Sequence, residues 1–303
     1  APLLPRDALA PFDEPRTERA RRDLRVQRRE SRESRGCPLT FAAGQSCSSP
    51  ESPCAVGMGT YLAASPPWHD GDALRPVVIH YHGAGATAAA VLQDHPLVEP
   101  ILARGYVLLA PVGLARPGEE GEYWSLGTRP PQRDEPRFLQ QILDDAAPRL
   151  HLDRSRVFVT GFSMGAALVW RLACEAPSTY AAYAPIEGGF WSAHANNCAG
   201  PVRLLLTQGW RDDAVPLEGR VQGSDAVQDG ILEGLQVWRR VNGCADPHAD
   251  RFATDAQFWR RAWTACAPGS ALTFVLHPGG HEVPAGWAAL ALDWFESVVP
   301  ASH

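Results

Sequence analysis

One serine stands in a setting that could make it a nucleophile. Ser163 is the central residue of the pentapeptide Gly-Phe-Ser-Met-Gly at 161–165. A β-branched run at 156–160 precedes it and an apolar run at 166–172 follows, which predicts a strand, a sharp turn and a helix. Such a turn needs small residues two positions before and after the serine, and both are glycine. The hydroxyl of Ser163 could therefore attack a carbonyl group, provided that a base activates it.

Two later segments could supply the base and the acid that orients it. Each is an apolar, strand-like run that ends in a glycine-containing loop. The run at 202–207 leads into a loop with Asp212 and Asp213, and the run at 272–276 leads into a loop where two glycines precede His281. We expect His281 to be the base and Asp212 the acid, with Asp213 as the alternative.

An earlier loop could bind the oxyanion that forms during attack. The apolar run at 75–81 is followed by His82, Gly83 and Ala84, whose small side chains would let backbone amides approach a substrate oxygen. We expect the amide of Met164 to supply one donor and an amide of Gly83 or Ala84 the other. The side chain of His82 is expected to brace this loop and to take no proton.

Aromatic and histidine residues near these loops have packing as an alternative role. Trp124, Trp191 and Trp210 lie in or beside loops where a cleft would form, and they could stack on a substrate. The chain has ten tryptophans, so core or rim packing is the commoner role for any one of them. His277, at the end of a predicted strand, is expected to be a packed histidine bonded to backbone.

The elements that would carry these residues alternate along the chain. We expect strands at 57–64, 75–81, 106–111, 156–160, 202–207 and 272–276, and helices at 88–104, 136–150, 166–172, 232–241 and 286–298. This alternation predicts an α/β fold with a mostly parallel central sheet and helices on both faces. Function would then lie in the loops at the carboxyl ends of the strands.

Composition divides the chain into two parts. Residues 1–35 carry ten arginines and seven acidic residues, and their few apolar residues cannot build a core. We expect an arginine-rich arm at 1–35, either solvated or in contact with an anionic surface, an anionic polymer or a second subunit of a homodimer, and one catalytic domain at 36–303. The domain has an excess of acidic residues, which argues against nucleic-acid binding. No run of eighteen apolar residues occurs, so we expect no membrane span.

Seven cysteines indicate an oxidising compartment. None lies in a Cys-x-x-Cys pair or beside a histidine at zinc spacing, so we expect disulfides and no structural metal. Disulfides are typical of secreted or periplasmic proteins. We expect three pairs, which are Cys47 with Cys54, Cys174 with Cys198, and Cys244 with Cys266. Cys37 is left free or pairs otherwise.

Together the motifs resemble the polyhydroxybutyrate depolymerase and feruloyl esterase branch of the α/β-hydrolases, over residues 57–295. The resemblance is carried by the following motifs: His82-Gly83, the turn at Ser163, Gly-x-x-Asp-x-x-Val-Pro around Asp212, the segment from Trp238 to Cys244, and Gly-Gly-His at His281. It implies the α/β-hydrolase fold, secretion, a Ser-Asp-His triad, a disulfide at Cys244, no metal or organic cofactor, and ester hydrolysis through an acyl-enzyme. The family commonly has a tryptophan before the proline after its histidine, whereas this chain has Glu282-Val283, which puts substrate choice in doubt.

Three functions compete on the sequence alone. The leading one is a secreted serine esterase that cleaves a polyester or a hydroxycinnamoyl or aryl ester. The alternative is a serine-dependent amide hydrolase acting on a polyanion such as polyaspartate, which the arginine arm and Arg211 favour and the acidic domain opposes. A binding protein that kept the fold without catalysis is the third, and the presence of all three triad residues argues against it.

Overall fold

The computed structural model describes residues 47–49, 51–66, 73–126, 132–191, 198–222 and 226–300. The predicted arm at 1–35 and Cys37 lie outside the described residues. Among the described helices, none is both long enough and apolar enough to cross a membrane.

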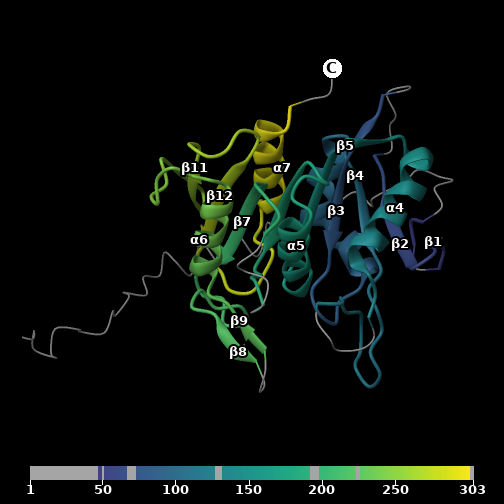
Figure 1. The fold of residues 1–303 in the computed structure, drawn as a ribbon. Helices are drawn as coiled ribbons and strands as arrows, with labels where there is room; N and C mark the ends of the chain where they lie inside the picture. Colours follow the sequence, from purple (N-terminus) through teal and green to yellow (C-terminus); the bar gives the residue numbers. More distant parts are fainter. Residues whose placement is uncertain are drawn as a thin grey trace, which may run out of the picture. The chain divides into compact units, whose positions relative to one another are not determined.

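A ten-stranded sheet forms the centre of the described domain (Figure 1). Its strands are β1 (Cys54–Val56), β2 (Gly59–Ala64), β3 (Arg75–Tyr81), β4 (Val107–Pro111), β5 (Leu152–Phe162), β6 (Ala182–Ile186), β7 (Arg203–Gly209), β10 (Arg251–Asp255), β11 (Phe258–Trp263) and β12 (Ala271–His277). They lie in the order β1-β2-β4-β3-β5-β6-β7-β12-β11-β10. All neighbours from β4 to β12 in this order are parallel, and the strands outside them are antiparallel. The predicted mostly parallel sheet is confirmed.

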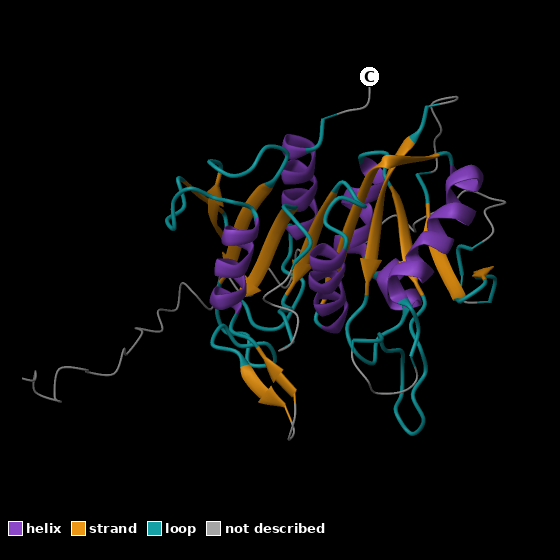
Figure 2. Cartoon of the chain, viewed as in Figure 1, coloured by secondary structure: helices purple, strands orange, loops and turns teal. Residues whose placement is uncertain are grey.

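Helices cover both faces of this sheet. They are α2 (Ala88–Gln93), α3 (His95–Ala103), α4 (Glu135–Leu150), α5 (Met164–Glu175), α6 (Ile231–Val241) and α7 (Trp287–Val298). Figure 1 shows α4, α5 and α6 in front of the sheet, and α3 contacts α7 on the other face. A separate hairpin of β8 (Arg220–Gln222) and β9 (Ala226–Gln228) lies near the edge to which the parallel strands point (Figure 2).

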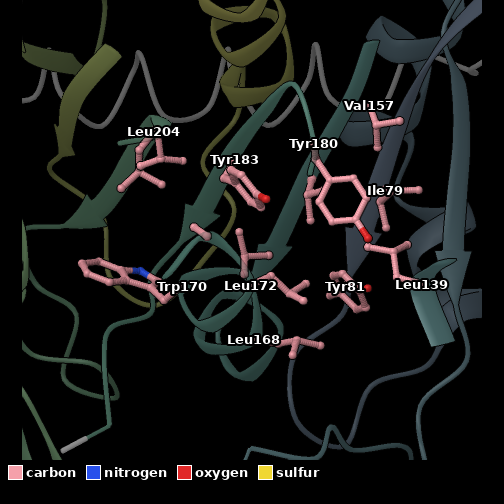
Figure 3. Packing of buried hydrophobic residues seen from close by; sticks show 14 of the residues in the cluster. Ile79, Tyr81, Leu139, Val157, Leu168, Trp170, Leu172, Tyr180, Tyr183 and Leu204 are labelled. Carbon is pink, nitrogen blue, oxygen red and sulfur yellow. The ribbon is translucent and has the colours of Figure 1, made fainter. Parts of the chain in front are cut away.

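The core is built on strands that are apolar on both faces, as parallel strands covered by helices must be. In β5, Val157 and Val159 belong to the core shared with α4 and α5, while Phe158 stacks on Phe295 of α7 with ring centroids 4.6 Å apart. Figure 3 shows Trp170 of α5 among the side chains of this core. Burying each such side chain stabilises the fold by roughly 1.5–3 kcal/mol before the entropy cost is subtracted.

The structure corrects the predicted elements in three places. The single helix expected at 88–104 is two helices, because Asp94 ends α2 and its carboxylate accepts the amide of Leu97 to begin α3. The strand expected at 57–64 is present as β2, but β1, which was not predicted, precedes it and pairs with it in a hairpin. The sequence analysis missed β6 and the antiparallel pair β10 and β11, whose short or exposed patterns resemble loops.

Three disulfides join the cysteines in the expected pairs. Cys47 bonds to Cys54, Cys174 to Cys198, and Cys244 to Cys266. The first anchors the start of the described domain to β1, the second joins the last turn of α5 to the chain that leads into β7, and the third fastens the end of α6 to the loop before β12.

Candidate active site

Ser163 occupies the turn between β5 and α5 in a conformation that few residues adopt. Its backbone has a φ of 55° and a ψ of −117°, and such strain is characteristic of functional sites. A Cβ on Gly165 would lie 2.2 Å from the carbonyl oxygen of Tyr81, and one on Gly161 would lie 2.7 Å from the carbonyl of Gly165. Only glycine fits at both positions, which explains the spacing seen in the sequence.

Ser163, His281 and Asp212 form a continuous chain of hydrogen bonds. The Nε2 atom of His281 lies 2.8 Å from the Oγ of Ser163, and its Nδ1 lies 2.9 Å from Oδ2 of Asp212. A carboxylate accepts hydrogen bonds only, so the partners assign the ring proton to Nδ1 and leave Nε2 free to accept the serine proton. Asp213, the alternative acid, is exposed and takes no part in this chain.

Asp212 is held as an ionised acceptor by its own loop. Its Oδ1 accepts the amides of Ala214 and Val215 at 2.9 and 2.7 Å, and its Oδ2 accepts the side-chain amide of Gln208 at 2.9 Å. Burial raises the pKa of Asp212, but hydrogen bonds from His281 and from the amide of Val215 outweigh it, so the pKa lies below its ordinary value. The carboxylate is therefore charged at neutral pH, where it can accept the hydrogen bond from Nδ1 of His281.

His281 is a stronger base than an isolated imidazole. Burial lowers its pKa, but hydrogen bonds and charge attraction from Asp212 and Glu187 outweigh burial and raise the pKa to about 9. The side chain keeps 22% of its surface exposed, so it can reach both the serine and an incoming substrate.

The acid loop and the histidine loop are tied together by hydrogen bonds. The amide of Trp210 donates to the carbonyl of His277 at 2.7 Å, and the amide of Arg211 donates to that of Gly279 at 2.9 Å. The Nε of Arg211 donates to the carbonyl of Pro278 at 2.8 Å. A Cβ on Gly209 would lie 2.4 Å from the carbonyl oxygen of Gly280. The glycine turn therefore permits the close approach that brings Asp212 to His281.

The glycine loop after β3 lies against the nucleophile. A Cβ on Gly83 would lie 3.3 Å from the Cβ of Ser163. The ring of His82 is buried and contacts the carbonyl of Gly83 at 2.8 Å and the carboxylate of Glu122 at 3.1 Å, so it lies in a position to brace the loop. Met164 is in the first turn of α5, where amide groups have no partner within the helix.

The three tryptophans lie in different settings. Trp124 is 1% exposed, donates to the carbonyl of His82 at 2.8 Å and packs edge-on against Tyr81, so it supports the glycine loop from inside the core and cannot stack on a substrate. Trp191 is half-buried and bridges to Gln228 of β9. Trp210, two residues before Asp212, is 62% exposed. Of these three tryptophans, Trp210 is the one whose side chain is largely exposed.

The sequence analysis missed Glu187, which lies beside the predicted triad. It follows β6, is fully buried, and its Oε2 lies 3.2 Å from Nδ1 of His281. Its Oε1 accepts Nε2 of His277 at 2.7 Å, so His277 is packed as expected but bonds to a carboxylate as well as to backbone. The signal in the sequence is a single charged residue inside the apolar run from Ala182 to Phe190.

Glu187, Asp212 and His281 also form a group that could ligate a cation, since their donor atoms lie within 4.8 Å of one another. Both oxygens of each carboxylate already accept N–H groups of the protein. The donor set therefore suits an imidazole held by carboxylates better than a metal ion.

Comparisons with known proteins point to esterases. No family model matches the chain. It is 24% identical over 187 residues to feruloyl esterase B of Piromyces equi, covering 57% of this chain and 34% of that protein. It is 25% identical over 149 residues to a probable feruloyl esterase C of Aspergillus niger, covering 48% of this chain and 49% of that protein. It is 28% identical over 234 residues to the putative esterase NocK of Nocardia uniformis, covering 70% of this chain and 66% of that protein. The matches thus span from a third to just under two thirds of the relatives' own length.

Solved structures share the fold. An acetyl xylan esterase from Aspergillus awamori superposes with a TM-score of 0.59 at 16% identity, over 78% of this chain and 93% of that one. The Bacillus cereus carboxylesterase superposes with a TM-score of 0.52 at 15% identity, over 80% of this chain and 95% of that one. At these identities the likeness concerns the fold alone. The chain therefore has the α/β-hydrolase fold, and the curated proteins to which it is similar are feruloyl esterases and a putative esterase.

Proposed function

We propose that this protein is a serine hydrolase that cleaves carboxylic esters through an acyl-enzyme on Ser163. The observation that carries the proposal is the pair of hydrogen bonds, 2.8 and 2.9 Å long, that link Ser163 to His281 and His281 to Asp212. His281 takes the proton as Ser163 attacks the ester carbonyl, and then gives it to the leaving alcohol. His281 next activates water, which releases the acid and restores Ser163.

The oxyanion is held by backbone amides in this proposal. Met164 supplies one from the first turn of α5, and Gly83 or Ala84 supplies the other from the loop against the serine. Trp210 and the half-buried Trp191 are the aromatic residues left to contact the substrate. Hydroxycinnamoyl and other aryl esters are the substrate class that the feruloyl esterase relatives support, and polyesters are the second class to test.

The amide hydrolase alternative has less support. Arg211, which motivated it, directs its Nε to the carbonyl of Pro278, and the curated relatives are named as esterases. The three disulfides favour an oxidising compartment, so we propose a secreted or periplasmic protein.

The test is a comparison of initial rates for the wild type and Ser163→Ala. Substrates are p-nitrophenyl esters of increasing acyl length, methyl ferulate, polyhydroxybutyrate and polyaspartate. We expect ester hydrolysis that falls by about 10⁴- to 10⁶-fold in Ser163→Ala, and labelling of the wild type alone by a fluorophosphonate. Activity confined to polyaspartate would favour the amidase, and ester hydrolysis that survives in Ser163→Ala would contradict the proposed nucleophile.

A further inference from the structure

Glu187 is a buried acid for which the proposed reaction has no role. Its side chain is fully buried at the end of β6, where an unpaired charge would be strongly unfavourable. Its backbone has a φ of 55°, a left-handed conformation that non-glycine residues seldom adopt outside functional sites. Both features are costly to the fold, so the groups that Glu187 contacts are informative.

Those contacts include two N–H groups that donate to its carboxylate. Oε1 accepts Nε2 of His277 at 2.7 Å, and Oε2 accepts the amide of Glu282 at 2.7 Å. The amide of Gly279 donates to Nδ1 of His277 at 3.2 Å. A neutral imidazole carries a proton on only one of its two nitrogens. Because Nδ1 of His277 accepts the amide of Gly279, the proton is on Nε2, which faces Glu187. Both of these groups therefore donate to the carboxylate of Glu187.

Two carboxylates therefore face one nitrogen of His281. Nδ1 lies 2.9 Å from Oδ2 of Asp212 and 3.2 Å from Oε2 of Glu187. The two acids come from loops after neighbouring strands, β7 and β6. Each has its own N–H donors, and this compensates for the repulsion between two buried charges.

The surroundings of His281 contain few other polar groups. Among the described residues, the groups that face its ring are Ser163 at Nε2, the two acids at Nδ1, and the ring of Phe162 with a centroid 4.8 Å away. His277 of β12 bonds to Glu187, whose other oxygen faces His281.

We propose that Glu187 is a second acid for His281, a positioning residue that holds Nδ1 together with Asp212 and is itself oriented by His277. The role rests on the proposed function, because it matters only if His281 is the base. The imidazolium that forms as Ser163 attacks is then stabilised by two charges, and Nδ1 keeps an acceptor when Asp212 is lost. Glu187 would touch no substrate atom.

Kinetics test the role with four variants: Glu187→Gln, Asp212→Ala, the double variant, and Asp213→Asn as the matched control. When no acid orients the histidine, kcat should fall by about 10⁴-fold, and we expect this loss in the double variant. Because Glu187 remains in Asp212→Ala, that variant should lose only about 100-fold in kcat. Glu187→Gln alone should lower kcat and leave KM unchanged, while Asp213→Asn should match the wild type. A loss of 10⁴-fold in Asp212→Ala, or wild-type kcat in a folded Glu187→Gln, would overturn the proposal.

A second measurement does not depend on activity. The pKa of His281 can be followed by NMR titration of ¹³Cε1-labelled histidine, with the resonance assigned by its absence in His281→Gln. Glu187→Gln should lower this pKa by about one to two units, as loss of an adjacent opposite charge does, whereas Asp213→Asn should not. An unchanged pKa in folded Glu187→Gln would refute the second acid.

The titration separates the two proposals. If no ester is cleaved and the pKa still falls in Glu187→Gln, the esterase proposal fails while the contact between Glu187 and His281 stands. If Glu187→Gln does not fold, Asp212→Ala carries the test, because Glu187 should hold the pKa of His281 above the ordinary value of about 6.5. A pKa below that value in Asp212→Ala would overturn the proposal.

Discussion

His281 is the proposed base of this site, and its pKa is set by the charged groups around it. One ring nitrogen faces Ser163, and the other faces two buried carboxylates. The serine must lose its proton to a neutral imidazole, yet the carboxylates favour the protonated form. The pH dependence of the proposed reaction is therefore governed chiefly by His281.

The first prediction concerns that pH. The pKa of His281 is raised to about 9, so the neutral base is a minor species at pH 7. We expect kcat/KM on a neutral p-nitrophenyl ester to rise with pH toward a midpoint near that value, once spontaneous hydrolysis is subtracted. A plateau reached already below pH 7 would contradict the expectation.

The same shift affects stability in a defined direction. The folded state binds the His281 proton more tightly than the unfolded chain, so this contribution is complete below the unfolded pKa of about 6.5 and is lost as the pH rises through the folded value. Asp212, whose pKa is lowered, stabilises the fold above its unfolded pKa and loses that effect on acidification.

A second residue-level prediction concerns Gly165. A Cβ there would meet the backbone carbonyl oxygens of Tyr81 and His82 at 2.2 and 2.6 Å, and backbone atoms cannot turn aside as a flexible side chain can. Gly165→Ala should cost about 2–3 kcal/mol or more in the free energy of unfolding, measured in urea, and should lower kcat by displacing Ser163.

Gly200→Ala is the matched control, because its Cβ would meet only the ring of Pro177 at 3.7 Å, an ordinary contact. Equal effects of the two substitutions would show that the close packing at the turn is not what requires glycine at 165.

At the scale of elements, the sequence predicted what has a strong local pattern. The buried parallel strands β3 and β5 each contain a short apolar run, at 77–79 and 157–159, and the steric demands of the turn at Ser163 leave a recognisable pentapeptide. Asp212 and His281 were found because each follows such a strand in a glycine loop. Asp212 and His281 lie close together because β7 and β12 are parallel neighbours in the sheet, so the loops that follow them are adjacent.

Elements whose position depends on distant contacts were missed. The five residues of β6 pass through the core and resemble part of a helix or loop, and β10 is exposed along its whole length and depends on pairing with β11. Because β6 was not recognised, Glu187 was not placed at the carboxyl end of a strand. Packing was the commoner role expected for Trp124, but its contact with the glycine loop was not predicted, since its partner His82 lies 42 positions earlier.

The disulfides give a prediction at this scale. Cys244 and Cys266 are 22 positions apart and join the end of α6 to the loop before β12, whereas Cys47 and Cys54 are 7 apart. In the chain-entropy model, removing a bond should cost about 3 kcal/mol for the longer loop and about 2 kcal/mol for the shorter one. Thermal and urea unfolding of the Cys→Ser double variants should show this order.

The Cys244–Cys266 bond lies near the start of β12, and the candidate active site lies beyond its carboxyl end. The variant without this bond should therefore keep the wild-type kcat/KM at 25 °C. A loss of activity without a loss of stability would indicate that the bond positions His281 directly.

On the scale of the whole molecule, charge separates the arm from the domain. Residues 1–35 carry ten arginines and seven acidic residues, a net charge of +3, and the chain as a whole carries −6. The remainder therefore carries −9, and attraction between exposed charges is screened beyond about 8 Å in physiological salt.

The last prediction is that the arm is separable from catalysis. A protein that lacks residues 1–35 should match the full chain in melting temperature and in kcat/KM on a neutral aryl ester, because the residues of the candidate site all lie beyond Gly57 in the described domain. If the arm contacts polyanions, the full chain alone should bind polyaspartate, with an affinity that falls steeply between 50 and 200 mM salt as ion release requires. Loss of activity or of thermal stability on truncation would instead assign the arm to the folded domain, and the boundary at residue 36 would be wrong.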